Sequence, residues 1–124
     1  MSSAKELEQL FRHSMPLFIA LGDEVRLSII EALGLAVYEE HQAGRDIAGQ
    51  PQVTMQNAAG LNVNEITRQT CLSRPAVSHH LKILKDAGLI GMRQSGTCNY
   101  YYLTLKESTE QLTELVHMLK DFIH

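Results

Sequence analysis

The sequence of 124 residues predicts a single domain, mainly α-helical, with one small β-hairpin near its C-terminal end. Apolar residues recur at three- and four-residue steps over most of the chain, which is typical of amphipathic helices. Between residues 89 and 104, two strand-like runs flank Gln94-Ser95-Gly96-Thr97, a pattern typical of a hairpin. No run approaches the roughly 18 apolar residues of a membrane span, so we expect no membrane partner.

Residues 1–34 are predicted to form two N-terminal helices. The first covers Ser3 to Leu21, and Pro16 is expected to kink or divide it because proline lacks the backbone N–H that a helix interior needs. Asp23 is a suitable N-cap for the second helix, whose apolar residues end with Leu33.

Residues 35–61 are predicted to be a loop insertion. Ala36 to His41 are compatible with a continuation of the second helix, but Gly44 to Gly60 has no steady period. Val53 to Met55 are compatible with a short strand. A loop of this length is often functional or disordered, so it either lines a ligand pocket or tolerates insertion without a role.

Residues 62–88 are predicted to form two helices joined by a tight turn, which is the arrangement of a helix-turn-helix. Asn62 followed by Glu65 has the form of a capping box. Ser73 is a suitable N-cap for the second of these helices, with Pro75 in its first turn. Gly88 is expected to end that helix as a left-handed C-cap. The following hairpin, residues 89–105, would then be a wing.

The second helix of this pair has a face that suits DNA. Val77, Leu81 and Leu84 fall at helical spacing and are expected to pack inward. Arginine can bind guanine bidentately, serine and histidine can contact other base edges, and lysine suits phosphate. From this face, its flanks and the wing, we expect the DNA-binding residues to be Arg68, Ser73, Arg74, Ser78, His79, Lys82, Lys85, Arg93, Ser95 and Thr97.

The charge distribution supports this interpretation. The whole chain carries a net charge of −3, yet residues 62–105 carry five basic and two acidic side chains and are locally positive. A protein that neutralises phosphates needs positive charge on one face and not in its total.

Two separated segments resemble the ArsR-type repressors, a family of winged helix-turn-helix regulators. The segment Leu72-Ser73-Arg74-Pro75-Ala76-Val77-Ser78-His79-His80-Leu81-Lys82-Ile83-Leu84-Lys85-Asp86-Ala87-Gly88-Leu89-Ile90 is similar to the recognition region of that family. Ala20 to Ile30 resembles the start of its second helix, and Tyr100-Tyr101-Tyr102-Leu103 resembles its second wing strand.

The resemblance implies a homodimeric repressor that binds a two-fold double-stranded DNA operator and is released by an inducer. It also implies dimerisation through the first helix and the last helix, residues 106–124. The apolar residues expected at that interface are Leu7, Leu10, Phe11, Leu112, Leu115, Val116, Leu119 and Phe122.

The inducer is left open by the sequence, and we expect no resident cofactor. Relatives that sense arsenic or cadmium usually place Cys-x-Cys where this chain has Asn62-Val63-Asn64, so the usual thiolate ligands are absent. The last helix carries a polar stripe that is either a solvated face or a metal site, and its candidate ligands are Glu114, His117, Asp121 and His124. Cys71 and Cys98 are either passive small residues or redox-sensitive thiols. The effector is therefore a small molecule, a metal ion or an oxidant.

An enzymatic function is not indicated, because the sequence has no glycine-rich phosphate loop, paired metal-ligand motif or nucleophile with a recognisable partner. The alternative to DNA binding is a winged-helix module that binds another protein. The polar, acidic start of the chain is unlike a signal peptide, so we expect a cytoplasmic protein.

Overall fold

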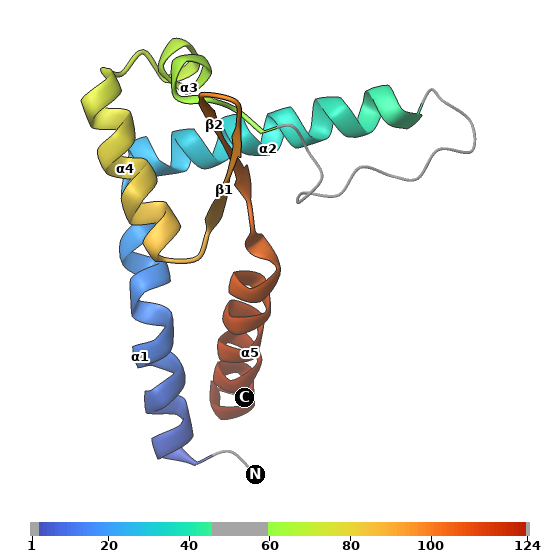
Figure 1. Ribbon diagram of the computed structural model, residues 1–124. Helices are drawn as coiled ribbons and strands as arrows, with labels where there is room; N and C mark the ends of the chain where they lie inside the picture. Colours follow the sequence, from blue (N-terminus) through green and yellow to red (C-terminus); the bar gives the residue numbers. More distant parts are fainter. Residues whose placement is uncertain (1–2, 46–59, 124) are drawn as a thin grey trace.

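The computed structural model describes residues 3–45 and 60–123, and it confirms a mainly helical fold with one hairpin (Figure 1). The elements run in the order α1 (Ala4–Leu21), α2 (Glu24–Arg45), α3 (Val63–Thr70), α4 (Arg74–Asp86), β1 (Ile90–Ser95), β2 (Cys98–Leu103) and α5 (Leu105–Ile123). Within the described ranges, no helix combines the length and the apolar character needed to cross a bilayer.

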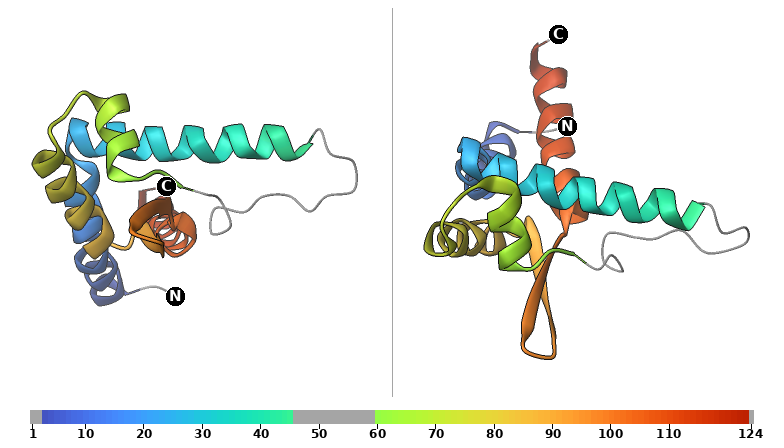
Figure 2. Two further views of the ribbon diagram at one scale, coloured as in Figure 1. Left: turned by 45° about the horizontal axis from the view of Figure 1, so that its top comes forward. Right: turned by 90° about the horizontal axis from the view of Figure 1, so that it is seen from above.

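The helices form two groups. α1 and α5 lie side by side with opposite chain directions, and α2 crosses the top of α1 (Figure 1). α3 and α4 pack against the first half of α2, and the β1–β2 hairpin projects away from the helices (Figure 2). The hairpin is therefore placed as a wing beside the helix-turn-helix.

One apolar core holds these elements together. It collects side chains from α1, α2, α3, α4 and the base of the hairpin. Its members are Leu17, Ala20, Ile29, Ala32, Leu33, Leu61, Ile66, Val77, Leu81, Leu84, Leu89, Ile90 and Leu103. Because α4 contributes three of these residues, its orientation is fixed by burial.

The hairpin is antiparallel, with pairs running from Ile90 and Leu103 at its base to Ser95 and Cys98 at its tip. Gly96 opens its two-residue turn at a φ of 64°, where glycine is favoured. Leu61 exchanges two backbone hydrogen bonds with Tyr101, with N···O distances of 2.9 and 2.8 Å. The chain that returns to α3 is thus fastened to the open edge of β2.

The predicted helix ends are confirmed. The Asn62 side chain accepts a hydrogen bond from the Glu65 backbone N–H at 2.8 Å, and the Glu65 carboxylate accepts one from the Asn62 backbone N–H at 3.0 Å. Ser73 Oγ accepts from the Ala76 N–H at 3.3 Å. Gly88 follows α4 with a φ of 78°, as a left-handed cap requires.

Two predictions about the N-terminal half are wrong. The loop was expected to begin at residue 35, but α2 continues to Arg45 because Gly34 is tolerated inside it. Pro16 does not divide α1, which is one helix from Ala4 to Leu21. The rest of the insertion, including the expected strand at residues 53–55, lies outside the described residues.

Candidate nucleic-acid interface

α4 is the centre of the candidate interface because one of its faces is fixed and the other is open. Val77 and Leu84 are fully buried and Leu81 is 2% exposed, so this face is committed to the core. The residues of the opposite face are exposed, namely Arg74, Ser78, His79, Lys82 and Lys85. This separation confirms the inward and outward faces expected from the sequence.

Arg26 fastens α4 to the rest of the domain. Its guanidinium donates to the Ala20 carbonyl at 2.7 Å and to the Ile19 carbonyl at 2.9 Å, and it contacts His80 Nδ1 at 3.4 Å. Since arginine only donates, the contact requires His80 to accept at Nδ1. His80 is therefore a hydrogen-bonded structural residue, as its position beside Leu81 predicted.

Asp23 fixes the start of α2, from which Arg26 projects. Its carboxylate accepts from the backbone N–H groups of Val25 at 2.8 Å and Arg26 at 3.2 Å. The hydrogen bond from the Arg26 backbone is the main cause that lowers the pKa of Asp23 below 3.8. The helix cap and the anchor of α4 thus involve the same residues.

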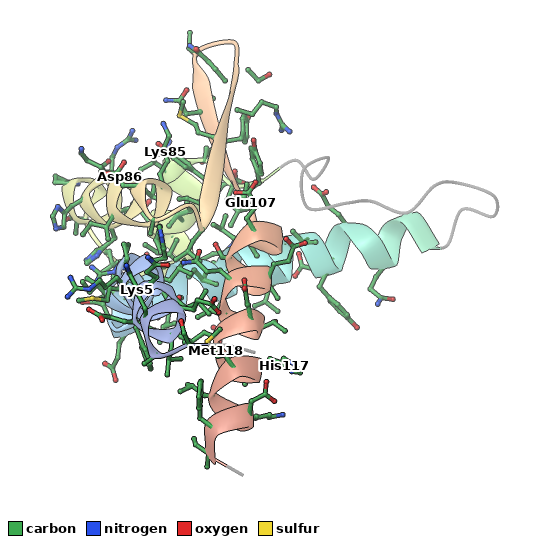
Figure 3. The ribbon with its side chains drawn as sticks, turned by 90° about the horizontal axis from the view of Figure 1, so that it is seen from below. Lys5, Lys85, Asp86, Glu107, His117 and Met118 are labelled. Atoms are coloured by element: carbon green, nitrogen blue, oxygen red, sulfur yellow. The ribbon has the colours of Figure 1, made fainter. Side chains whose placement is uncertain are left out.

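A cleft of about 290 Å³ lies between α4 and the wing. Its polar lining includes Ser78, Lys82 and Lys85 from α4 and Tyr101 from β2. Lys82 pairs with Asp86 across 3.7 Å, but both side chains are mostly solvent-exposed, so this pair is readily exchanged for a phosphate contact. Figure 3 shows Lys85 and Asp86 at the end of α4 that leads into the wing.

A second cleft, of about 170 Å³, lies between the start of α3, the start of α4 and the wing tip. Its lining combines amide, guanidinium, hydroxyl and thiol groups from Asn62, Val63, Asn64, Arg74, Thr97, Cys98 and Asn99. Arg74 Nη1 donates a hydrogen bond to Asn64 Oδ1 inside this cleft. The lining contains no carboxylate, so the charge of Arg74 is not neutralised there.

The wing supplies the remaining expected contacts. Arg93, Ser95 and Thr97 are all exposed, and the Arg93 guanidinium lies 5.8 Å from the centre of the Tyr100 ring. Ser73 and Arg68 are exposed as well, although Arg68 lines neither cleft. All ten residues expected to bind DNA are accessible, and the two clefts bring together Arg74 with Thr97 and Ser78 with Lys82 and Lys85.

The residues expected at a dimer interface divide into three groups. Phe11, Val116 and Phe122 are exposed, whereas Leu7, Leu10, Leu112 and Leu119 are half-buried. Leu115 is only 2% exposed, so its place at an interface between chains is wrong: the packing of α5 against α1 buries it within the chain. The accessible apolar surface of α1 continues over Met15, Phe18 and Ile19.

The stripe on α5 is accessible and dispersed. Glu114, His117 and Asp121 are exposed, and His117 points away from α1 whereas Met118 points toward it (Figure 3). Within one chain, the described residues bring no three histidine, cysteine or acidic side chains close enough to hold a metal ion. His124 lies outside the described residues. Cys71, at a φ of 60° in the turn before α4, and Cys98 in the wing are both free and exposed.

Comparison with known proteins supports this description of the interface. Residues 55–91 match the model of the bacterial regulatory protein family arsR. A segment of 46 residues is 41% identical to an uncharacterised HTH-type transcriptional regulator of Methanocaldococcus jannaschii. A segment of 43 residues is 51% identical to the HTH-type transcriptional regulator Rv2034 of Mycobacterium tuberculosis.

These segments cover 37% and 35% of this chain, and they span only 51% and 40% of the two relatives. Solved structures extend the similarity over nearly the whole chain. Reduced HlyU from Vibrio cholerae is 26% identical, with a TM-score of 0.61 over 93% of this chain and 96% of that one.

The chain is a member of the ArsR family. A second solved structure supports the fold alone, since its sequence identity to this family member is 24%. It is the homodimeric winged helix-turn-helix DNA-binding domain of a possible ArsR-family regulator from Mycobacterium bovis, with a TM-score of 0.56 over 97% of this chain and 88% of that one.

Sequence reasoning missed three residues of this ArsR-family interface. Arg26 was taken only as part of a helix signature, and Tyr101 only as an aromatic strand residue. Asn64 was noted only because a thiolate ligand is absent there. Their roles depend on contacts with residues distant in the sequence, and no local pattern indicates such contacts.

Proposed function

We propose that this ArsR-family protein is a homodimeric, sequence-specific DNA-binding transcriptional regulator that reads the major groove with α4. The observation that carries the proposal is the open face of α4, where Arg74, Ser78 and His79 precede Lys82 and Lys85. The helix begins at Arg74, so its N-terminal end presents the groups that suit base edges. The lysines follow toward the wing, where phosphate contacts are expected.

The homodimer is supported by the surface of α1 and α5. Phe11, Phe18 and Ile19 on α1 and Val116 and Phe122 on α5 are large apolar residues that remain at least 41% exposed. Clustered apolar surface of this kind marks an interface. The M. bovis domain with the same fold is homodimeric by description, and a dimer would present two copies of α4 to a two-fold operator.

We further propose that the regulator acts as a repressor and that an effector releases it from the operator. The effector remains a small molecule, a metal ion or an oxidant. A metal ion would be held by α5 stripes, and an oxidant would act at Cys71 or Cys98, next to the proposed DNA-binding elements. Metal analysis of the purified protein, and DNA binding measured with and without a reductant, separate these effectors.

The salt dependence of DNA binding tests the phosphate contacts. Lys82→Ala and Lys85→Ala should each weaken binding to any duplex and reduce the slope of log K against log salt concentration by about 1 per protomer contact. Lys120→Ala is the matched control, because Lys120 is an exposed lysine in the last turn of α5. Fluorescence anisotropy with a labelled duplex between about 50 and 200 mM salt measures all of these slopes.

Equal slopes for the wild type, the α4 variants and the control would contradict the assignment of α4 to phosphate binding. Absence of duplex binding even at low salt would instead favour a winged-helix module that binds protein.

A further inference from the structure

Asn64 and Arg74 are the starting point, because they join the two helices of the helix-turn-helix at the end that would face a base pair. Arg74 is the first residue of α4, and its side chain is exposed. Asn64 lies in the first turn of α3 and is also exposed. The guanidinium Nη1 donates to the Asn64 Oδ1 acceptor.

The backbones of both residues are firmly held. α3 starts with a two-way capping box between Asn62 and Glu65, and Leu61 is paired with Tyr101 of the wing. Ile66, one turn further along α3, is completely buried. The Asn64 backbone carbonyl accepts from Thr67 Oγ1 at 2.7 Å. Asn64 is therefore a fixed acceptor and not part of a loose loop.

The bond leaves most of Arg74 available. A guanidinium has five N–H donors in a rigid fork, and the bond to Asn64 uses one of them at Nη1. The Nη2 and Nε donors can still form a bidentate contact with guanine. The amide of Asn64 is neutral, so it orients the guanidinium without cancelling its charge, which a carboxylate would do.

We propose that Asn64 is a positioning residue for DNA sequence recognition: it holds the Arg74 guanidinium in the orientation that reads a base edge. The inference rests on the proposed function of α4. The position where some relatives are expected to carry a metal-binding thiolate would here serve operator selectivity. Without Asn64, an exposed arginine samples many rotamers, and the cost of immobilising it falls on DNA binding.

The test compares the dissociation constants for a selected operator duplex and a scrambled duplex at one salt concentration. Arg74→Ala should reduce the ratio of the two constants about 10-fold or more, because a bidentate contact is lost. Asn64→Ala should reduce it about 3-fold to 10-fold, which corresponds to one long side chain immobilised. Binding to the scrambled duplex should change less than about 2-fold.

Two further variants separate positioning from general structure. In an Arg74→Ala background, Asn64→Ala should have no additional effect on the ratio, since it acts through Arg74. Asn64→Asp keeps an oxygen acceptor, so the ratio should recover toward the wild-type value while both affinities fall because of the added negative charge. Gln69→Ala, an exposed amide on the same helix, is the control for truncation of a side chain.

An unchanged ratio or tighter operator binding by Asn64→Ala, with Arg74→Ala still losing selectivity, would overturn the positioning role and leave the proposed function intact. Persistence of the Asn64→Ala effect in the Arg74→Ala background would also overturn it. A wild-type protein with no preference between the duplexes would overturn the inference together with the reading role of α4.

Discussion

Gly60 and Gly88 both have positive φ, but replacement by alanine should destabilise the domain more at Gly60. Their φ values are 75° and 78°, so the conformational cost of an alanine in the left-handed region is similar at both, about 1–2 kcal/mol. An added Cβ at Gly88 would have no heavy atom within 4 Å. At Gly60 it would lie 2.4 Å from the Tyr101 carbonyl oxygen, a distance that requires the backbone to move.

The additional cost at Gly60 follows from what must move. The clashing carbonyl accepts the Leu61 N–H at 2.9 Å, and the reciprocal bond from Tyr101 to Leu61 is 2.8 Å. Each bond contributes about 0.5–1.5 kcal/mol, so losing both adds about 1–3 kcal/mol. Gly60→Ala should therefore reduce the free energy of unfolding by about 2–5 kcal/mol, and Gly88→Ala by about 1–2 kcal/mol.

Urea denaturation followed by circular dichroism, at one protein concentration, measures both values. Equal destabilisation of the two variants, within about 0.5 kcal/mol, would refute the idea that the Leu61–Tyr101 pair fastens the start of the helix-turn-helix to the wing.

Two other perturbations test the parts that orient α4. Leu84→Ala should reduce the free energy of unfolding by about 2–5 kcal/mol because Leu84 is completely buried, whereas Leu84→Met should cost less than about 1.5 kcal/mol; similar losses for both would contradict close packing at this position. Asp23→Ala should lower the Tm near neutral pH, because the native carboxylate has a lowered pKa and accepts two backbone N–H groups. A lowered pKa in the folded state stabilises above the unfolded pKa, near about 4, and this contribution is lost as the pH falls through the folded pKa. The Tm difference between wild type and variant should therefore shrink below about pH 4, and a pH-independent difference would contradict this role of Asp23.

Most of the fold that is set by local interactions could be predicted from the sequence. The capping box at Asn62 and Glu65, the cap at Ser73 and the glycine after α4 each involve residues within a few positions of one another. The faces of α4 follow from helical spacing alone. For the same reason, the exposed residues of the candidate interface were found.

The features that were missed depend on contacts between distant segments or on the balance of weak preferences. The contact of Arg26 with His80 and the pairing of Leu61 with Tyr101 join residues far apart in the sequence. The length of α2 was underestimated, because Gly34 lowers helix propensity by only about 1 kcal/mol and the flanking residues outweigh it. Leu115 has the same helical spacing as exposed neighbours, and only the position of α1 decides that it is buried.

Selection of DNA from a random duplex pool tests the central claim most directly, which is that α4 reads sequence with its N-terminal end. The wild-type protein and the Arg74→Ala/His79→Ala double variant should be compared at equal fractional binding. We expect the wild type to enrich a two-fold symmetric site, and the variant to bind duplex DNA without enriching that site. Enrichment of the same site by both proteins would contradict the claim.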